Sequence, residues 1–356
     1  MQESQSQFEK RKRDHIRIAL DPRSQTAGQS GLDSIELVHE ALPDMDYKEV
    51  DISTSFIFKS TAQSSAKSIA LPLSSPIFIS SMTAGHEKGH EINAALARLS
   101  DRRQILMGVG SQRRELDDSN AAEEWVRVRK QAPNALLLGN IGIAQLIKTP
   151  IDKIQKLIES TEAKALFVHL NPLQEVLQPE GTTDFRHGLI AIENLVKISG
   201  VPVIVKEVGC GFSVGTLKRL QETGIFAVDI SGKGGTHWGR VEGYRSQDGS
   251  ILSQVAETFA NWGISTVQSV LNSHEARVNY EIWASGGVRN GLDVAKLCAL
   301  GASKVGVAQP FLQAALEGDE ALENLLNRLE MELKISLFCT GSKNLKDLQM
   351  KVFQRS

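Results

Sequence analysis

The sequence predicts an α/β protein whose main domain is a (β/α)8 TIM barrel. Eight short apolar runs rich in branched residues alternate with helical segments between residues 76 and 307. Strand–helix alternation repeated eight times is typical of a closed barrel rather than an open sheet. A hydrophobic content of 41% in 356 residues is ample for a full core. One domain overall is therefore expected, with residues 1–75 as an N-terminal basic arm and lead-in and residues 76–356 as the barrel.

The predicted elements follow from apolar runs, cap residues and turn residues. The strands are expected at residues 76–80, 104–109, 135–138, 165–168, 202–205, 227–230, 281–284 and 304–307. Helices are expected, among others, at residues 91–103, 150–161, 214–222 and 292–300, the last ended by Gly301 as a C-cap.

The two ends of the chain carry less pattern. Residues 1–9 are predicted to be disordered, and the basic run at residues 10–15 is typical of a solvated, mobile arm. The alternating stretch at residues 55–59 indicates an edge hairpin that could close the bottom of the barrel. Residues 314–354 are long enough for a capping helix pair.

Composition excludes several classes of partner. With 40 basic and 42 acidic residues the net charge is −2, which does not favour nucleic acid or an acidic membrane surface. Three widely spaced cysteines without a CxxC pair make a disulfide framework or structural zinc improbable. The N-terminus lacks the apolar segment of a secretory signal, so a cytoplasmic protein is expected.

The stretch at residues 169–175 concentrates polar groups directly after a buried strand. In a barrel, the loops that follow the strands share one face and hold the chemistry. His169, Asn171, Gln174 and Glu175 therefore indicate a site for a substrate or a metal ion. One carboxylate suits Mg²⁺ completed by waters and phosphate oxygens better than it suits zinc. The alternatives are a hydrogen-bonded structural histidine and a surface glutamate beside a turn.

Other strand ends indicate an anion site. Glycines and Arg289 after the seventh strand, with the helix starting near residues 290–293, favour a phosphate at loops seven and eight. Lys206 ends a strand that should be buried on both faces. It could pair with Glu207 or Asp229, or it could face a bound anion or an electron-rich ring. Small polar residues at other strand ends, taken singly, would most often be caps.

The ordered set of motifs resembles the type 2 isopentenyl diphosphate isomerases, which are FMN-dependent barrel enzymes. The resemblance covers nearly the whole chain and rests on residues 11–16, 81–83, 110–113, 169–175, 202–209, 232–238 and 284–293. It implies interconversion of isopentenyl and dimethylallyl diphosphate without net redox change, with reduced FMN supplying the proton-transfer chemistry. It further implies Mg²⁺, NADPH as the reductant, and a homotetramer or homooctamer.

The resemblance also implies residue roles. FMN is expected at Ser80, Ser81, Met82, Thr83, Ser111, Asn140, Lys206 and Thr236, with its phosphate at Gly287, Val288, Arg289, Ala308 and Gln309. Substrate is expected at Arg11, Lys12, Ser111, Gln112, Arg113, Asn171 and Gln174. Mg²⁺ is expected on Glu175, and the catalytic candidates are Gln174 and His169. Lys206 would stabilise negative charge on the reduced ring. Ala84 stands where many relatives carry glycine, a change that the flavin loop is expected to tolerate.

Two other functions compete with this one. An FMN-dependent 2-hydroxy-acid oxidase or dehydrogenase would need a strand-end histidine as base and an arginine for the carboxylate, for which His237 and Arg289 are candidates. A non-catalytic flavin or nucleotide sensor is the other alternative. The 169–175 motif together with the basic arm suits a metal-bound diphosphate better than a carboxylate.

Overall fold

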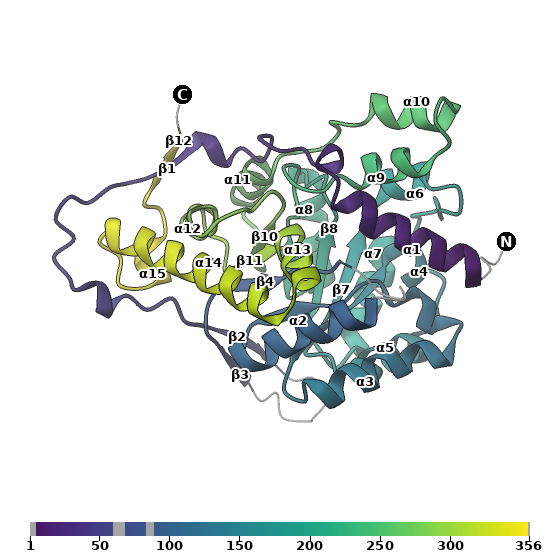
Figure 1. The fold of residues 1–356 in the computed structure, drawn as a ribbon, viewed down its shortest axis with the longest axis horizontal. Helices are drawn as coiled ribbons and strands as arrows, with labels where there is room; N and C mark the ends of the chain where they lie inside the picture. The colour runs from purple at the N-terminus through teal and green to yellow at the C-terminus, as the bar shows by residue number, and fades with distance from the viewer. Residues whose placement is uncertain (1–4, 60–67, 83–88, 355–356) are drawn as a thin grey trace.

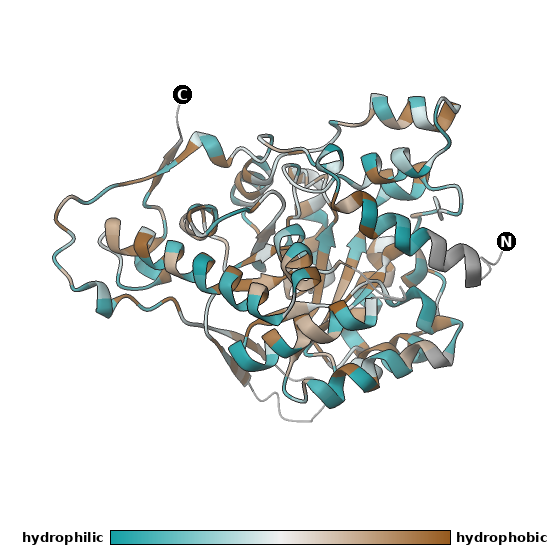
Figure 2. Cartoon of the chain, in the orientation of Figure 1, coloured by the Kyte–Doolittle hydropathy of each residue, from teal (hydrophilic) through white to brown (hydrophobic). Residues whose placement is uncertain are grey.

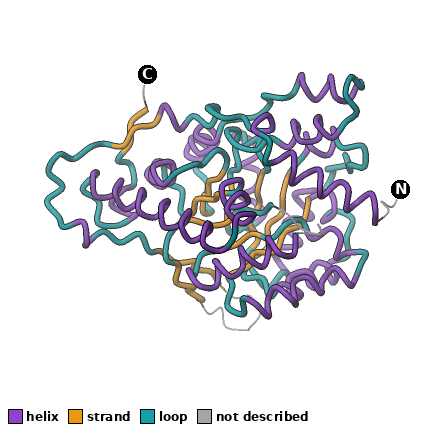
Figure 3. Tube along the Cα trace, viewed as in Figure 1, coloured by secondary structure: helices purple, strands orange, loops and turns teal. Residues whose placement is uncertain are grey.

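Eight parallel strands close into a barrel at the centre of the molecule (Figures 1 and 3). The computed structural model describes residues 5–59, 68–82 and 89–354. In chain order the barrel strands are β4 (Ile77–Ile79), β5 (Leu106–Gly108), β6 (Leu136–Gly142), β7 (Ala165–Leu170), β8 (Val203–Glu207), β9 (Ala227–Asp229), β10 (Glu281–Ser285) and β11 (Lys304–Val307). Each pairs with its sequence neighbour, and β11 pairs with β4 to close the ring. All eight predicted strands are confirmed within one or a few residues at their ends.

Helices surround the barrel, as Figure 1 shows. They are α2 (Gly89–Arg103), α3 (Glu123–Gln131), α4 (Ile143–Leu146), α5 (Ile151–Thr161), α6 (Pro172–Leu177), α7 (Gly188–Ile198), α8 (Val214–Leu220), α9 (Trp238–Arg245), α10 (Ile251–Thr258), α11 (Thr266–Ala276), α12 (Gly291–Ala299) and α13 (Gln309–Glu317). The four helices predicted by range are confirmed, and Gly301 follows α12 with a left-handed φ of +101°. Figure 2 shows apolar residues concentrated on the central strands and polar residues on the outer helix faces.

The core has two layers because barrel strands are buried on both faces. Outward-facing strand residues such as Val168 and Val205 pack against the helices in one cluster. Inward-facing residues such as Phe78, Phe167 and Trp283 fill the barrel interior in a second cluster. Packed side chains therefore fill the barrel interior, and a site in this fold is expected on the carboxyl rim.

A hairpin closes the opposite end of the barrel. Strands β2 (Thr54–Lys59) and β3 (Ser68–Leu73) pair antiparallel. The Phe56 ring is 1% exposed and lies 5.9 Å from the Trp283 ring and 5.3 Å from the Phe226 ring, between centroids. The predicted hairpin and its closing role are confirmed.

Residues 5–19 are helical, so the prediction of disorder was wrong for residues 5–9, and the solvated arm expected at residues 10–15 has two of its side chains buried. These residues form helix α1 (Gln5–Ala19), which lies against α9. Arg11 is 5% exposed and His15 is 8% exposed, because both side chains lie between α1 and the barrel rim. Their partners come from distant parts of the chain, which a local pattern of polar residues does not reveal.

The C-terminal segment forms more than the predicted helix pair. After α13, the chain continues through α14 (Asp319–Cys339) and α15 (Leu345–Leu348) to strand β12 (Val352–Gln354). Strand β12 pairs antiparallel with β1 (Ile35–Leu37), so the C-terminus is tied to the lead-in. Among the described helices, none is both long and apolar enough to cross a bilayer.

Candidate active site

The loops at the carboxyl rim and helix α1 enclose one large pocket. Its empty space is about 1220 Å³, including open solvent at its mouth. Apart from Gln112, each predicted site residue in the described part of the chain lines this pocket: Arg11, Lys12, Ser80, Ser81, Met82, Ser111, Arg113, Asn140, His169, Asn171, Gln174, Glu175, Lys206, Thr236, Gly287, Val288, Arg289, Ala308 and Gln309. Thr83 and Ala84 lie outside the described residues.

Gln112 lies beneath the pocket instead of lining it. Its side chain is buried, accepts a hydrogen bond from the Asn140 backbone N–H at 2.9 Å, and donates to the Leu157 carbonyl and the Glu115 carboxylate at 3.1 Å each. With its amide satisfied by protein groups, Gln112 holds the end of β6 in place. This geometry favours a positioning role over the substrate contact that the resemblance implied.

His169 is held as a neutral imidazole. Asn140 donates from Nδ2 to the Val109 carbonyl at 3.1 Å, which fixes its Oδ1 as the acceptor facing His169 Nδ1 at 2.8 Å. The histidine therefore carries its proton on Nδ1 and leaves Nε2 as an acceptor. Burial, and then the nearby charges of Lys206 and Lys12, lower the pKa of His169 to about 3.

An oxygen-rich corner forms at the start of α6. Pro172 fits the first turn of this helix, and Asn171 precedes it. Asn171 Nδ2 donates to the Glu175 carboxylate and to the Gln174 side-chain oxygen, at 3.0 Å each. Asn171 Oδ1 is buried yet has no hydrogen-bond partner among the described residues. A carboxylate beside an unsatisfied amide oxygen is a donor set suited to a hard cation or a substrate group.

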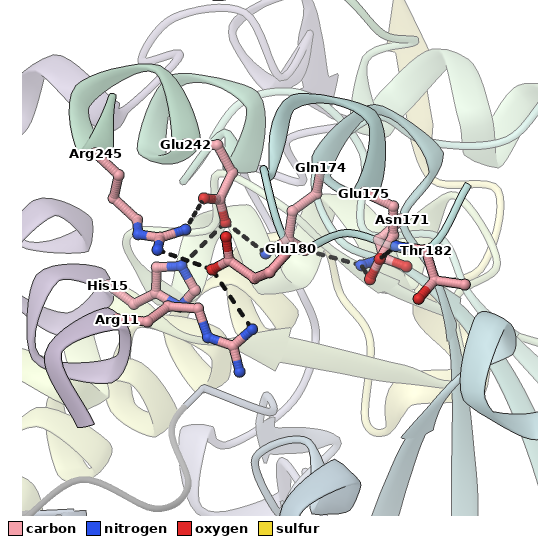
Figure 4. Close-up of polar contacts among 9 residues, drawn as sticks. All are labelled: Arg11, His15, Asn171, Gln174, Glu175, Glu180, Thr182, Glu242 and Arg245. Carbon is pink, nitrogen blue, oxygen red and sulfur yellow. Dashed lines mark hydrogen bonds and ion pairs between the residues drawn. The ribbon is translucent and has the colours of Figure 1, made fainter. Parts of the chain in front are cut away.

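Sequence reasoning missed Glu242, which lies at the centre of a charged network between α1, α6 and α9 (Figure 4). Its buried carboxylate accepts hydrogen bonds from His15 Nε2 at 3.0 Å and Gln174 Nε2 at 3.1 Å, and it pairs with Arg245. Burial by itself raises the pKa of Glu242, but His15, Arg245 and Gln174 together lower it to about 2. Glu242 is therefore an anion that holds Gln174, a candidate for catalysis, against the pocket.

The same network reaches Arg11 through Glu180. Arg245 Nη2 lies 2.9 Å from Glu180 Oε1, and Arg11 Nη1 lies 3.7 Å from the same oxygen. Figure 4 shows the two guanidinium groups on either side of this carboxylate. In the sequence, the only local sign of this network is that Glu242 lies one helical turn before Arg245 on α9. An ordinary surface ion pair has the same spacing, so the sequence does not reveal the burial.

Lys206 satisfies both alternatives considered from the sequence. Its Nζ donates to the Glu207 carbonyl at 2.6 Å and lies 3.7 Å from Asp229 Oδ2, while its side chain lines the pocket. Asp229 is fully buried, and Ser285 Oγ donates to its Oδ1 at 2.7 Å. The carboxylate therefore fixes the ammonium at the rim, where it can meet an anionic or electron-rich ligand.

The positive helix end beside the glycines belongs to α13 rather than α12. The start of α12 is already occupied, because Asn290 caps the Asp293 N–H at 2.8 Å and Glu332 accepts from the Gly291 N–H at 2.6 Å. Ala308, which precedes α13, provides no side-chain cap, and it lines the pocket. The uncapped N-terminus of α13 therefore lies at the pocket, where it can meet a bound anion.

Glycines allow two loops to meet at this point. Gly286 and Gly287 have left-handed φ angles of +104° and +81°. A Cβ on Gly235 would lie 2.8 Å from the Gly287 nitrogen, so the loops after β9 and β10 touch through their backbones. The glycines that the sequence indicated after the seventh strand thus meet a second glycine-rich loop, and residues 232–236 and 286–289 together form a glycine cradle.

His237 is a structural residue. It is fully buried, its Nε2 lies 2.9 Å from the Trp262 carbonyl, and its Nδ1 accepts from the Arg240 N–H at 3.3 Å. With both ring nitrogens engaged and the side chain outside the pocket lining, His237 does not suit the role of a general base. This geometry disfavours the 2-hydroxy-acid alternative.

Comparison with known proteins identifies the family. An isopentenyl-diphosphate delta-isomerase of Bdellovibrio bacteriovorus is 78% identical over 351 residues, covering 99% of both chains. The chain belongs to the isopentenyl-diphosphate delta-isomerase family. Family members from Legionella pneumophila (strain Paris) and Halobacterium salinarum are 51% and 42% identical, and the alignments cover 99% and 97% of this chain and 99% and 92% of theirs.

The isomerase-family chain also matches flavoprotein folds. Residues 181–355 match the model of the FMN-dependent dehydrogenase family. A flavocytochrome b2 mutant with pyruvate bound superposes with a TM-score of 0.66 at 20% identity, covering 97% of this chain and 82% of the other. A mandelate oxidase mutant with (S)-mandelic acid gives 0.61 at 17% identity, covering 100% and 99%. These two structures share the barrel fold with the isomerase-family chain.

Proposed function

We propose that this chain interconverts isopentenyl and dimethylallyl diphosphate, using reduced FMN and Mg²⁺. The observation that carries the proposal is the single pocket in which cations from α1, the oxygen-rich corner of α6, Lys206 and the α13 N-terminus converge. Family membership at 78% identity supplies the reaction class, and the pocket residues supply matching chemistry.

The residues present fit FMN. The hydroxyls of Ser80 and Ser81 are buried at the pocket without hydrogen-bond partners among the described residues, so they are free to bond a ligand ring. The α13 N-terminus and the two-loop glycine cradle suit its phosphate, and Lys206 suits the negative charge of a reduced ring. When bound, reduced FMN would supply proton transfer to the alkene.

The residues present also fit Mg²⁺ held jointly with the substrate diphosphate. Glu175 offers one carboxylate, and the unsatisfied Asn171 Oδ1 lies in the same corner. No group of three or more His, Cys, Asp or Glu suited to a metal ion occurs among the described residues. Magnesium usually takes one or two carboxylates, waters and substrate phosphate oxygens, so this sparse set is sufficient.

The protein's own groups would bind and orient the substrate. The Arg11, Lys12 and Arg113 side chains line the pocket and can make charge-assisted hydrogen bonds to diphosphate oxygens, with Ser111 beside them. Arg11, Lys12 and His15 of helix α1 line one side of the pocket, where the helix would help to exclude water from a state with carbocation character. Isomerisation adds a proton to the terminal methylene carbon and removes one from the methylene on the other side of the double bond.

Gln174 and His169 are the candidates for contact with the reacting carbons. Gln174 Nε2 donates to Glu242, and its Oε1 accepts from Asn171, so both ends of the amide are held. His169 Nε2 is an unprotonated acceptor because its Nδ1 holds the proton. A neutral histidine adds no positive charge beside a reaction centre with carbocation character.

The test is an anaerobic assay. Purified protein with isopentenyl diphosphate, Mg²⁺ and chemically reduced FMN should form dimethylallyl diphosphate. No product under these conditions rejects the proposal, and oxidation of a 2-hydroxy acid instead would favour the competing reading. Lys206→Ala should raise the Kd for FMN about tenfold or more, because a charge-assisted contact is lost; undiminished FMN retention would count against the role of Lys206.

We also propose NADPH as the reductant, a homotetramer or homooctamer, and a cytoplasmic location. The three cysteines are unpaired, which supports a reducing compartment. Sedimentation of the holoenzyme and reduction of bound FMN by NADPH would test the first two points.

A further inference from the structure

Gln25 connects three parts of the molecule through one side chain. It lies just after α1 and the short helix η1 (Pro22–Ser24) and is 8% exposed. Its Nε2 donates to the Ala19 carbonyl at the end of α1, at 3.1 Å, and to Thr236 Oγ1 at 3.0 Å, and it also lies 3.0 Å from the neighbouring Ser24 Oγ. Its Oε1 accepts from Arg289 Nη2 at 2.8 Å. The amide thus joins helix α1 to both loops of the glycine cradle.

The backbone keeps the Gln25 side chain in this position. Gln25 and Thr236 form an antiparallel bridge, in which the Thr26 N–H donates to the Gly235 carbonyl at 2.8 Å and the His237 N–H donates to the Ser24 carbonyl at 2.9 Å. Arg240 Nη1 donates to the Gln25 carbonyl at 2.7 Å. Because the backbone is fixed on both sides, the amide cannot move far without breaking these contacts.

The amide group has the donor and acceptor set that this position requires. The Arg289 guanidinium needs an acceptor, whereas the Ala19 carbonyl needs a donor. A carboxylate would face the carbonyl with no proton, and an ammonium would face the guanidinium with a like charge. Glutamine supplies both roles at the required reach. Thr236 and Arg289 are proposed FMN contacts, and they line the pocket together with Lys12 of α1.

We propose that Gln25 is a positioning residue that couples FMN binding to the placement of helix α1. The inference rests on the proposed function, because it takes Thr236 and Arg289 as FMN contacts and the α1 side chains as diphosphate contacts. FMN that fixes Thr236 and Arg289 also fixes Gln25, and Gln25 then holds the C-terminal end of α1. Coupling of this kind is reciprocal, so an ordered α1 strengthens FMN binding in turn.

The test compares two glutamines of the same segment in the full-length chain. Gln25→Met keeps the side-chain length but removes every hydrogen bond of the amide group. Gln29→Met is the matched control, because Gln29 bonds the exposed Asn261 side chain and does not line the pocket. For each protein, FMN fluorescence titration gives the Kd, steady-state assays at saturating FMN give KM and kcat, and thermal melting shows whether the fold is intact.

Gln25→Met should raise the FMN Kd about tenfold and the KM for isopentenyl diphosphate several-fold, with kcat within about twofold of the wild-type value. Gln29→Met should behave as wild type. Equal effects of the two variants, or a loss confined to kcat, would overturn the inference.

Hydrogen exchange on the wild-type chain gives an independent measurement if Gln25→Met does not fold. Adding FMN should slow amide exchange in residues 11–19, which make no proposed contact with the FMN phosphate. No FMN-dependent protection there would overturn the coupling. If the wild-type protein isomerises substrate but shows neither the Gln25→Met effect nor the FMN-dependent protection, this inference alone is overturned. If the wild-type protein binds no FMN, the proposed function is overturned as well.

Discussion

Replacing Glu242 by glutamine tests whether the buried network between α1 and α9 depends on an ionised carboxylate. The Glu242 side chain is fully buried and pairs with His15 and Arg245. Its pKa is about 2 against an ordinary value of 4.5. That difference corresponds to about 3 kcal/mol of native-state stability at pH 7.

The sign of the pH dependence follows from the lowered pKa. The unfolded state binds a proton at Glu242 before the native state does, so the contribution is fully present above pH 4.5. It is lost as the pH falls from 4.5 through about 2. Glu242→Gln removes the titrating group, so wild type and variant should differ by about 3 kcal/mol at pH 7 and by only about 1.4 kcal/mol at pH 3.

Urea unfolding of the FMN-free protein at several pH values between 7 and 3 measures this difference without a contribution from ligand binding. Glu257→Gln is the control, because Glu257 is an exposed residue of the neighbouring helix α10 and its replacement should change stability by less than about 0.5 kcal/mol. A stability difference between wild type and Glu242→Gln that stays constant across this pH range would refute the reasoning.

Three further predictions follow. Glu175→Gln should raise the Mg²⁺ concentration needed for half-maximal activity about tenfold while leaving the FMN Kd unchanged, because one charge-assisted ligand is lost; the same Mg²⁺ dependence as wild type would exclude Glu175 as a ligand. Arg11→Ala should raise KM for isopentenyl diphosphate about tenfold, whereas Arg17→Ala, on the exposed side of the same helix, should not; equal KM values would remove α1 from the diphosphate site. Phe56→Ala should lower the free energy of unfolding by about 3 to 5 kcal/mol by leaving a cavity under Trp283, with KM unchanged. Urea titration and steady-state kinetics would check both parts. A loss of substrate affinity without a loss of stability would contradict the role of the hairpin in closing the barrel.

The sequence by itself determined the elements whose signals are local. Continuous apolar runs such as 165–168 specify strands buried on both faces, and their repetition specifies the barrel. Barrel topology then places the strand ends on one rim, which is why the sequence predicts one site for residues as distant as His169 and Arg289.

Tertiary structure alone decided the contacts between segments that are far apart in the chain. Helix α1 looked solvated because its residues are polar, yet His15 is buried by Glu242, more than two hundred residues away. Gln112 stands among the residues of a binding motif, yet its amide turns to the Asn140 backbone. The Glu332 contact at the start of α12 and the Gln25 contact with Arg289 depend likewise on partners from other elements. The local sequence does not specify which partner a polar side chain will bond. The closed barrel determines which donors and acceptors come within hydrogen-bonding distance.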